Sequence, residues 1–406
     1  MGRSQLFRRY SVLDYTLCKM SQILRSLFSI GFRPFFLGAS IYSVVSILLW
    51  MGIYVFSWSI KPTDLVPMYW HAHEMIFGYA VAVIAGFLLT AVRNWTGHST
   101  PEGGSLFLLM LPWLISRVIM VSGWGDLVVS VGLDTLFVAL LLISLLIPII
   151  KARQWRNFGV VIKLLFLMGS NIVFYLGVIG VVPDGIRLGL YSGLYLIVAL
   201  IVMIGGRVIP FFIQKGVDGE VDLKTWPFIN IASLVLFIGY FVAELLNPMG
   251  LSTGLFAGAI AVVLSLRLLG WYTHKIWKKP LLWVLYIAYA NIVLGFVLKG
   301  FAILGLVSLN LSLHAFAYGA IGMSTLGMMS RVSWGHTGRN IKCPPMIVGW
   351  LFAMLVLGLI FRVLFPLLLP GQYVTWILCS QLCWVVSFLG FICTYTSVLI
   401  RPRVDN

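Results

Sequence analysis

The chain has 406 residues, of which 61% are hydrophobic and only 10% are charged. About a quarter of the residues in a soluble domain are charged, so this composition excludes one and indicates a protein that lies mostly in lipid. The net charge of +16 does not indicate a nucleic-acid partner, because the Lys and Arg residues are spread between hydrophobic segments.

Hydrophobic runs long enough to cross a hydrocarbon layer of about 30 Å, which takes about 20 helical residues, recur along the chain. We therefore expect an all-α, polytopic membrane protein of about twelve transmembrane helices. The expected spans are 35–58, 67–92, 105–122, 127–150, 158–182, 188–213, 226–246, 251–272, 281–304, 308–333, 346–369 and 373–400. Residues 1–34 precede this single membrane domain of residues 35–400, and residues 401–406 form a short tail.

Positive charges are distributed unevenly between the loops. If residues 1–34 are cytoplasmic, the segments on that side hold 23 of the 28 Lys and Arg residues. The remaining five are Lys61, Arg117, Arg187, Lys299 and Arg362. This asymmetry follows the positive-inside rule and predicts that both termini are cytoplasmic.

Two distant parts of the chain share a pattern of residues. The first contains His73, Gly78, Gly86, Thr96 and Gly97, and the second contains His314, Gly319, Gly327, Thr337 and Gly338, 241 residues later. The next helix of each part repeats LI-x-RV around Arg117 and Arg362. We therefore interpret residues 35–150, 151–272 and 281–400 as four-helix repeats, the middle one diverged. Membrane helices share glycine and terminal-arginine patterns anyway, so this alternative stays open.

His73 and His314 are expected at matching depth in the membrane. Pro67 and Ser308 suit helix starts that place each histidine six residues, about 9 Å, inside its helix. The small residues that follow would face away, turning both imidazoles toward one shared centre. One imidazole from each of two facing helices is the arrangement that holds haem iron from both sides. A pair of core histidines bonded to the backbone is the alternative.

Other polar residues near the outer ends of the helices extend this candidate site. His71 lies two positions before His73 and should point away from it, so the two cannot chelate one metal. Glu74 should share the face of His71 and orient it, complete a copper site, or form a structural hydrogen bond. Arg117 and Arg362 suit the propionates of a haem, or else snorkel toward the headgroups.

A basic cluster is expected at the cytoplasmic side. It comprises Arg207, Arg331, His336 and Arg339. Anion binding is one interpretation of this cluster. The topology alone, however, requires basic loops at that face.

Several segments resemble the NnrS family. They are FRPFFLGAS (32–40), WHAHEMIFGYA (70–80), GFLLTAVRNWTG (86–97), GGRVIPFF (205–212), HAFAYGAIG (314–322) and GMMSRVSWGHTGR (327–339). The resemblance implies a bacterial inner-membrane protein that contains haem, expected to be of b type, and copper. It also implies a link to denitrification and to protection against nitric oxide stress.

The expected helix arrangement also resembles the catalytic subunit of haem-copper oxidases, which is a likeness of fold alone. The sixth and seventh helices contain no histidine, so the oxidase-type copper ligands have no counterpart there. Carboxylates inside the helices are few. We therefore do not expect a terminal oxidase or a proton pump.

These observations favour a haem-binding membrane protein, with copper as a further candidate metal, in which a metal binds nitric oxide or receives electrons from a donor. A transporter for a metal or a small anion, with a transient histidine site, is the second hypothesis. A membrane assembly or scaffold protein is the third.

Overall fold

The computed structural model describes residues 20–59, 65–123 and 126–405, and every regular element within them is helical. The expected all-α fold is thus confirmed for this part of the chain. Most of the N-terminal segment 1–34, and Lys61 of the first loop, lie outside the described residues.

The helices succeed one another with short connections. In chain order they are α2 (Phe32–Tyr54), α3 (Pro67–His73), η1 (Glu74–Ala80), α4 (Val81–Thr96), α5 (Gly104–Ser122), α6 (Leu127–Lys151), η2 (Trp155–Asn157), α7 (Phe158–Val178), α8 (Gly185–Gly216), α9 (Pro227–Leu246), α10 (Leu251–Trp271), η3 (His274–Lys278), α11 (Pro280–Ile303), α12 (Leu309–His314), η4 (Ala315–Gly322), α13 (Met323–Gly335), α14 (Met346–Leu359), η5 (Ile360–Leu364), α15 (Phe365–Leu368), η6 (Pro370–Gln372) and α16 (Tyr373–Ile400).

Eleven helical runs in the described part of the chain are long and apolar enough to cross a membrane. The twelfth expected span, 308–333, corresponds to α12, η4 and α13, which follow one another directly but are more polar. This run packs against α8, α11 and α16. Its buried polar side chains are Ser312, Ser324, Thr325, Ser330, Arg331 and Ser333. A helix enclosed by other helices does not need an apolar surface toward lipid, which explains its composition.

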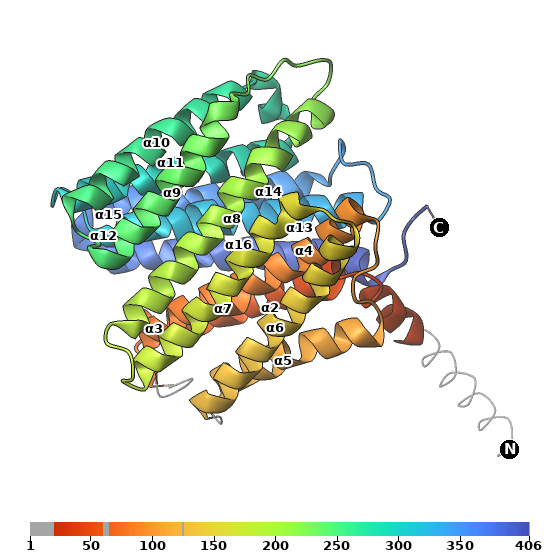
Figure 1. The fold of residues 1–406 in the computed structure, drawn as a ribbon, viewed down its shortest axis with the longest axis horizontal. Helices are drawn as coiled ribbons and strands as arrows, with labels where there is room; N and C mark the ends of the chain where they lie inside the picture. Colours follow the sequence, from red (N-terminus) through yellow and green to blue (C-terminus); the bar gives the residue numbers. More distant parts are fainter. Residues whose placement is uncertain (1–19, 60–64, 124–125, 406) are drawn as a thin grey trace, which may run out of the picture.

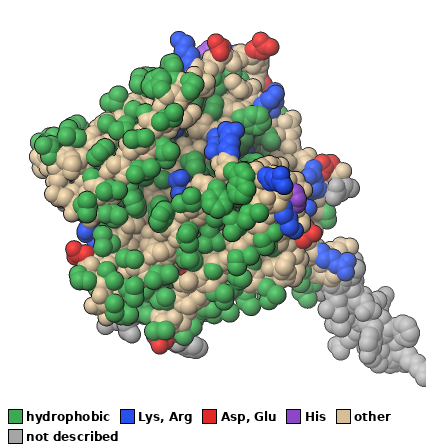
Figure 2. Space-filling view, viewed as in Figure 1, with side chains coloured by type: hydrophobic (Ala, Val, Ile, Leu, Met, Phe, Trp, Pro, Cys, Tyr) green, Lys and Arg blue, Asp and Glu red, His purple; other side chains and the backbone are tan. Residues whose placement is uncertain are grey.

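The outer surface of the bundle is apolar, as a bilayer requires. Hydrophobic side chains cover most of the face drawn in Figure 2. Leu246 and Ile231 are 81% and 68% exposed, and dozens of other large hydrophobic residues are exposed as well. Soluble proteins rarely expose apolar patches of this extent, so the surface confirms a multi-pass membrane protein.

The candidate residues lie at one end of the bundle. In Figure 1, α3, α12 and α15 lie at the end opposite to the C-terminus, whereas α4 and α13 finish near the C-terminus. Pro67 occupies the first turn of α3, and the Ser308 side chain caps α12 by accepting a hydrogen bond from the Asn310 backbone N–H at 3.4 Å. Both helix starts are thus confirmed, and they place the histidines near the same end.

Three π-helical stretches interrupt the spans at that end. η1 and η4 begin directly after His73 and His314, and η5 contains Arg362. A π turn closes its hydrogen bonds over five residues instead of four, which changes the direction in which later side chains point. Such turns are rare, and they occur frequently at functional sites.

Candidate metal-binding site

His73 lies in a fully buried cluster of charged side chains. Its Nδ1 is 2.7 Å from Glu74 Oε1, and its Nε2 is 2.8 Å from Asn171 Oδ1. Glu74 Oε2 accepts a hydrogen bond from Arg117 Nη1 at 2.5 Å and another from the Tyr42 hydroxyl. Each ring nitrogen of His73 therefore already has an oxygen partner.

Asp134 completes this cluster, which we call the ion network. Arg117 Nη2 donates to Asp134 Oδ1 at 2.5 Å, and the Tyr175 hydroxyl donates to Asp134 Oδ2 at 3.2 Å. The side chains of Arg117 and Asp134 are only 2% and 5% exposed. The ion network comprises Tyr42, His73, Glu74, Arg117, Asp134, Asn171 and Tyr175. Both carboxylates of the ion network contact Arg117, and both terminal nitrogens of Arg117 are engaged.

The structure does not bring His73 and His314 together, in contrast to the sequence-based expectation. The expectation placed Gly78 on the side opposite to His73. A Cβ atom added at Gly78 would instead lie 2.5 Å from Arg117 Nη1 and 3.1 Å from Glu74 Oε2. Gly78 thus faces the ion network, because η1 is π-helical and a residue five positions on returns to nearly the same side.

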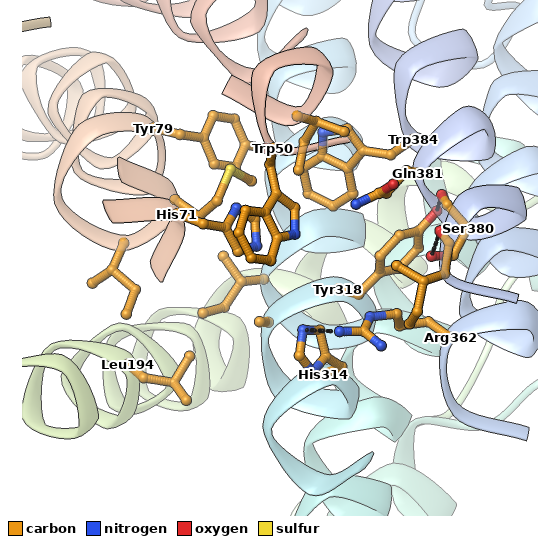
Figure 3. A pocket seen from close by; sticks show the side chains of 16 residues that line it. Trp50, His71, Tyr79, Leu194, His314, Tyr318, Arg362, Ser380, Gln381 and Trp384 are labelled. Atoms are coloured by element: carbon orange, nitrogen blue, oxygen red, sulfur yellow. Dashed lines mark hydrogen bonds between the residues drawn. The ribbon is translucent and has the colours of Figure 1, made fainter. Parts of the chain in front are cut away.

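His71 and His314 line one cavity instead (Figure 3). The cavity has a volume of about 80 Å³. On one side, the rings of His71 and Trp50 stack with their centroids 4.7 Å apart and an angle of 4° between the planes. Arg362 and Gln381 line the opposite side with His314. His71 and His73 therefore lie in different surroundings, as the sequence predicts, with His71 in the cavity lining and His73 in the ion network.

Hydrogen bonds at both nitrogen atoms hold the His314 ring in one orientation. Nδ1 donates to the backbone carbonyl oxygen of Asn310 at 2.8 Å, which leaves the lone pair on Nε2. That lone pair accepts a hydrogen bond from Arg362 Nη2 at 2.7 Å. Arg362 Nη1 in turn donates to the Tyr373 hydroxyl at 3.2 Å. Metal-binding histidines are commonly oriented by a carbonyl in this way, so Nε2 is positioned as a ligand once Arg362 releases it.

Three buried polar atoms of the cavity lining have no hydrogen-bond partner. They are Nδ1 of His71 and both amide atoms, Oε1 and Nε2, of Gln381. Gln381 is only 5% exposed. A buried polar atom without a partner costs about 1–3 kcal/mol, and such atoms are usually satisfied by a water, an ion or a ligand. The lining therefore indicates that something polar or metallic completes this cavity.

The donor atoms of the cavity suit a single soft metal ion. They are the imidazole nitrogens of His71 and His314 and the thioether sulfur of Met75. Copper accepts imidazole and thioether ligands, whereas hard cations require oxygen ligands. No group of three or more His, Cys, Asp and Glu side chains in the described residues could hold a metal. A zinc site of the usual composition is thus not formed by the part of the chain that the structure describes.

A haem does not fit the cavity as its side chains stand. Sites for small-molecule ligands and cofactors have volumes of roughly 300–1,000 Å³, against about 80 Å³ here. Arg117, expected at a haem propionate, is enclosed in the ion network. Arg362 does reach the cavity, but its guanidinium group is directed at His314.

Glu74 does not lie beside His71 as expected, but it does form structural hydrogen bonds. It contacts His73 and Arg117 and has no bond to His71. At the position that the proposed repeat makes equivalent, the chain has Ala315. Arg362 consequently meets His314 directly, whereas Glu74 stands between His73 and Arg117 in the first unit. The repeats themselves stay a prediction.

The four residues of the expected basic cluster have separate partners. Arg207 donates to Asn157 Oδ1 at 3.2 Å, Arg331 lies 3.9 Å above the Phe212 ring, the His336 ring lies 6.0 Å from that of Phe32, and Arg339 donates to Thr337 Oγ1 at 2.7 Å. Burial, and then the positive charge of Arg403, lower the pKa of His336. These contacts do not direct the four side chains at one anion.

Trp50 and Gln381 are site residues that the sequence analysis missed. Trp50 belongs to α2 and Gln381 to α16, so their positions in the chain give no sign that they meet. A lone buried amide in a long apolar helix is itself a signal, because such a group is costly without a partner.

No curated protein matches the chain. The model of one family, the NnrS protein, matches residues 26–403. That range covers almost all of the 406 residues, including both histidine segments. The chain therefore belongs to the NnrS protein family.

Proposed function

We propose that this protein holds a copper ion between His71 and His314 and binds nitric oxide at that ion. Family membership supports a membrane protein of the nitric oxide response. The observation that carries the finer assignment is the pair of available imidazole nitrogens, the unpartnered Nδ1 of His71 and the Nε2 of His314. Copper in such a site supplies one-electron chemistry and an open coordination position for a diatomic gas.

Arg362 controls access to the His314 ligand atom. Its hydrogen bond occupies Nε2, so a metal binds only when the guanidinium group withdraws. The Tyr373 hydroxyl is already bonded to Arg362 and offers a place for the displaced group. The Coulomb repulsion between Arg362 and a metal ion is twice as large for a doubly charged ion as for a singly charged one. Arg362 therefore favours the cuprous over the cupric ion.

Trp50 and Gln381 shape the rest of the cavity. Stacking against Trp50 fixes the plane of the His71 ring, and so the direction of its lone pair. The Gln381 amide offers one donor group and one acceptor oxygen, both without a partner in the protein. These atoms are suited to hydrogen-bond a diatomic ligand or a water beside the metal.

Haem is implied by the family resemblance, and we assign no step to it because the cavity does not fit a porphyrin. We also propose the bacterial inner membrane as the location, with both termini cytoplasmic. Under that topology the histidine end of the bundle faces outward. The uneven distribution of Lys and Arg between the loops supports this orientation.

Copper binding by matched histidine variants tests the proposal. The purified full-length protein, loaded with cuprous ion and freed of excess metal, should retain one copper per chain. His71→Phe and His314→Phe should each lose it, whereas His73→Gln should keep it. Infrared spectroscopy should then show nitric oxide on the copper-loaded protein.

Thermal unfolding of each metal-free variant separates loss of the site from loss of the fold. If both His71→Phe and His314→Phe are folded and still retain copper, the assignment of the copper ion to His71 and His314 is refuted. Equal loss of copper in His73→Gln would do the same.

A further inference from the structure

A second cavity of about 90 Å³ lies between α4, α8, α11 and α13. Its lining is almost purely apolar and includes Val83, Phe87, Leu200 and Met328. Dry apolar cavities in proteins are known to take up molecules such as xenon. Nothing in the proposed metal site uses this space.

The second cavity continues the first one along the same helices. Three pairs of residues, one in each cavity, lie three or four positions apart on a shared helical run: Tyr79 and Val83, Leu194 and Ile197, and Ile321 and Thr325. Three or four positions make one helical turn, about 5.4 Å. The apolar cavity therefore begins where the histidine cavity ends.

One hydrogen bond joins the linings of the two cavities. The Tyr79 hydroxyl and Thr325 Oγ1 are 2.5 Å apart, with Tyr79 lining the histidine cavity and Thr325 the apolar one. The Tyr79 ring packs edge-on against Trp384 and Phe388, with centroids 5.9 and 5.6 Å away. The Tyr79–Thr325 contact is thus a polar contact between the two linings, in apolar surroundings.

The apolar cavity opens toward the outside of the bundle. Four of its lining residues, Ile84, Phe87, Ile201 and Ile204, are half-buried, whereas Val83 and Leu200 are buried. In a membrane, the outside at this level is the hydrocarbon of the lipid. Molecules that dissolve in hydrocarbon therefore reach the cavity without crossing the charged end at Arg362.

We propose that the apolar cavity takes small apolar gas molecules, nitric oxide among them, from the bilayer and delivers them across the Tyr79–Thr325 contact to the histidine cavity. The proposal of gas uptake depends only on the apolar lining of the second cavity. Delivery to a metal rests in addition on the proposed function. Nitric oxide is small, uncharged and nearly apolar, so it concentrates in hydrocarbon and suits a dry cavity of this size.

Xenon is the probe for uptake, and it requires no metal. Crystals of the full-length, metal-free protein under xenon pressure should show a xenon atom in the apolar cavity. Val83→Phe should remove it by filling the space, and Val235→Phe, the same change at a residue of α9 that is 60% exposed, should leave it in place. A wild-type cavity without xenon, or xenon unaffected by Val83→Phe, would overturn the uptake step.

Rebinding of nitric oxide after photolysis tests delivery in the copper-loaded protein. Val83→Phe, and Ile201→Trp at the half-buried edge of the cavity, should slow rebinding severalfold. Thr325→Val keeps the shape but removes the partner of the Tyr79 hydroxyl, and it should speed rebinding. Val235→Phe should match the wild type.

The outcomes separate the two proposals. If xenon enters the cavity but the copper-loaded protein binds no nitric oxide, the proposed function fails and uptake stands. If nitric oxide binds at the wild-type rate in both Val83→Phe and Ile201→Trp, the delivery route is wrong and the proposed function stands.

Discussion

Replacing Arg117 by leucine should destabilise the protein far more than the same substitution at Arg362. The two arginines stand in the same LI-x-RV pattern. Arg117 joins two buried carboxylates, Glu74 and Asp134, at 2.5 Å each. Arg362 instead donates to His314 and to the Tyr373 hydroxyl. The first substitution leaves two buried negative charges without their cation, and the second leaves none.

The magnitudes differ accordingly. Removing one partner of a buried ion pair costs about 3–5 kcal/mol, mainly because the remaining charge stays out of water. Losing a hydrogen bond made by a charged donor such as Arg362 costs about 1.5–3 kcal/mol. Because Arg117→Leu strands two buried carboxylates, we expect it to lose more unfolding free energy than Arg362→Leu.

Thermal unfolding of metal-free protein in one detergent, followed by circular dichroism, gives the comparison. Adding Glu74→Gln and Asp134→Asn to Arg117→Leu removes the stranded charges and should recover part of the lost stability. Equal losses for the two arginine variants, or no recovery in the combined variant, would refute this account of the ion network.

Two further predictions concern packing and pH. A Cβ atom at Gly177 would lie 2.3 Å from the backbone nitrogen of Ile186. Gly177→Ala should therefore force α7 and α8 apart and lower the free energy of unfolding by about 1–3 kcal/mol. Gly169→Ala on α7, where an added Cβ atom has no neighbour within 4 Å, should be neutral or stabilising in the same unfolding assay. Because burial and then Arg403 hold the pKa of His336 below its usual value of 6.5, the unfolded chain takes up a proton that the folded chain does not. Stability should therefore fall as the pH drops below that value, and His336→Gln should flatten this dependence in unfolding measurements across the pH range.

The helical spans were predictable because lipid constrains composition so strongly. A backbone in hydrocarbon must satisfy its own hydrogen bonds, so each crossing appears as an apolar helical run. The starts of α3 and α12 were predictable too, because Pro67 and the Ser308 cap act locally. The span that holds His314 is the most polar one because other helices surround it.

The direction of the histidines was not predictable from helical periodicity. Regular α-helical spacing assigned His73 to the shared centre, but η1 and η4 are π-helical and follow the histidines immediately. The proposed repeat also suggested that His73 and His314 have similar surroundings. They do not, because Glu74 contacts the His73 ring, whereas the equivalent residue Ala315 cannot form such a contact and His314 lines the cavity. Contacts such as those of Trp50 and Gln381 depend on the packing of distant helices.

X-ray absorption spectroscopy of the copper-loaded full-length protein tests the central claim most directly, because it counts imidazole ligands. The account predicts two imidazoles in the wild type, two in His73→Gln, and fewer than two in both His71→Phe and His314→Phe. Two imidazoles in His71→Phe, or the loss of one in His73→Gln, would contradict it and return His73 to the metal centre.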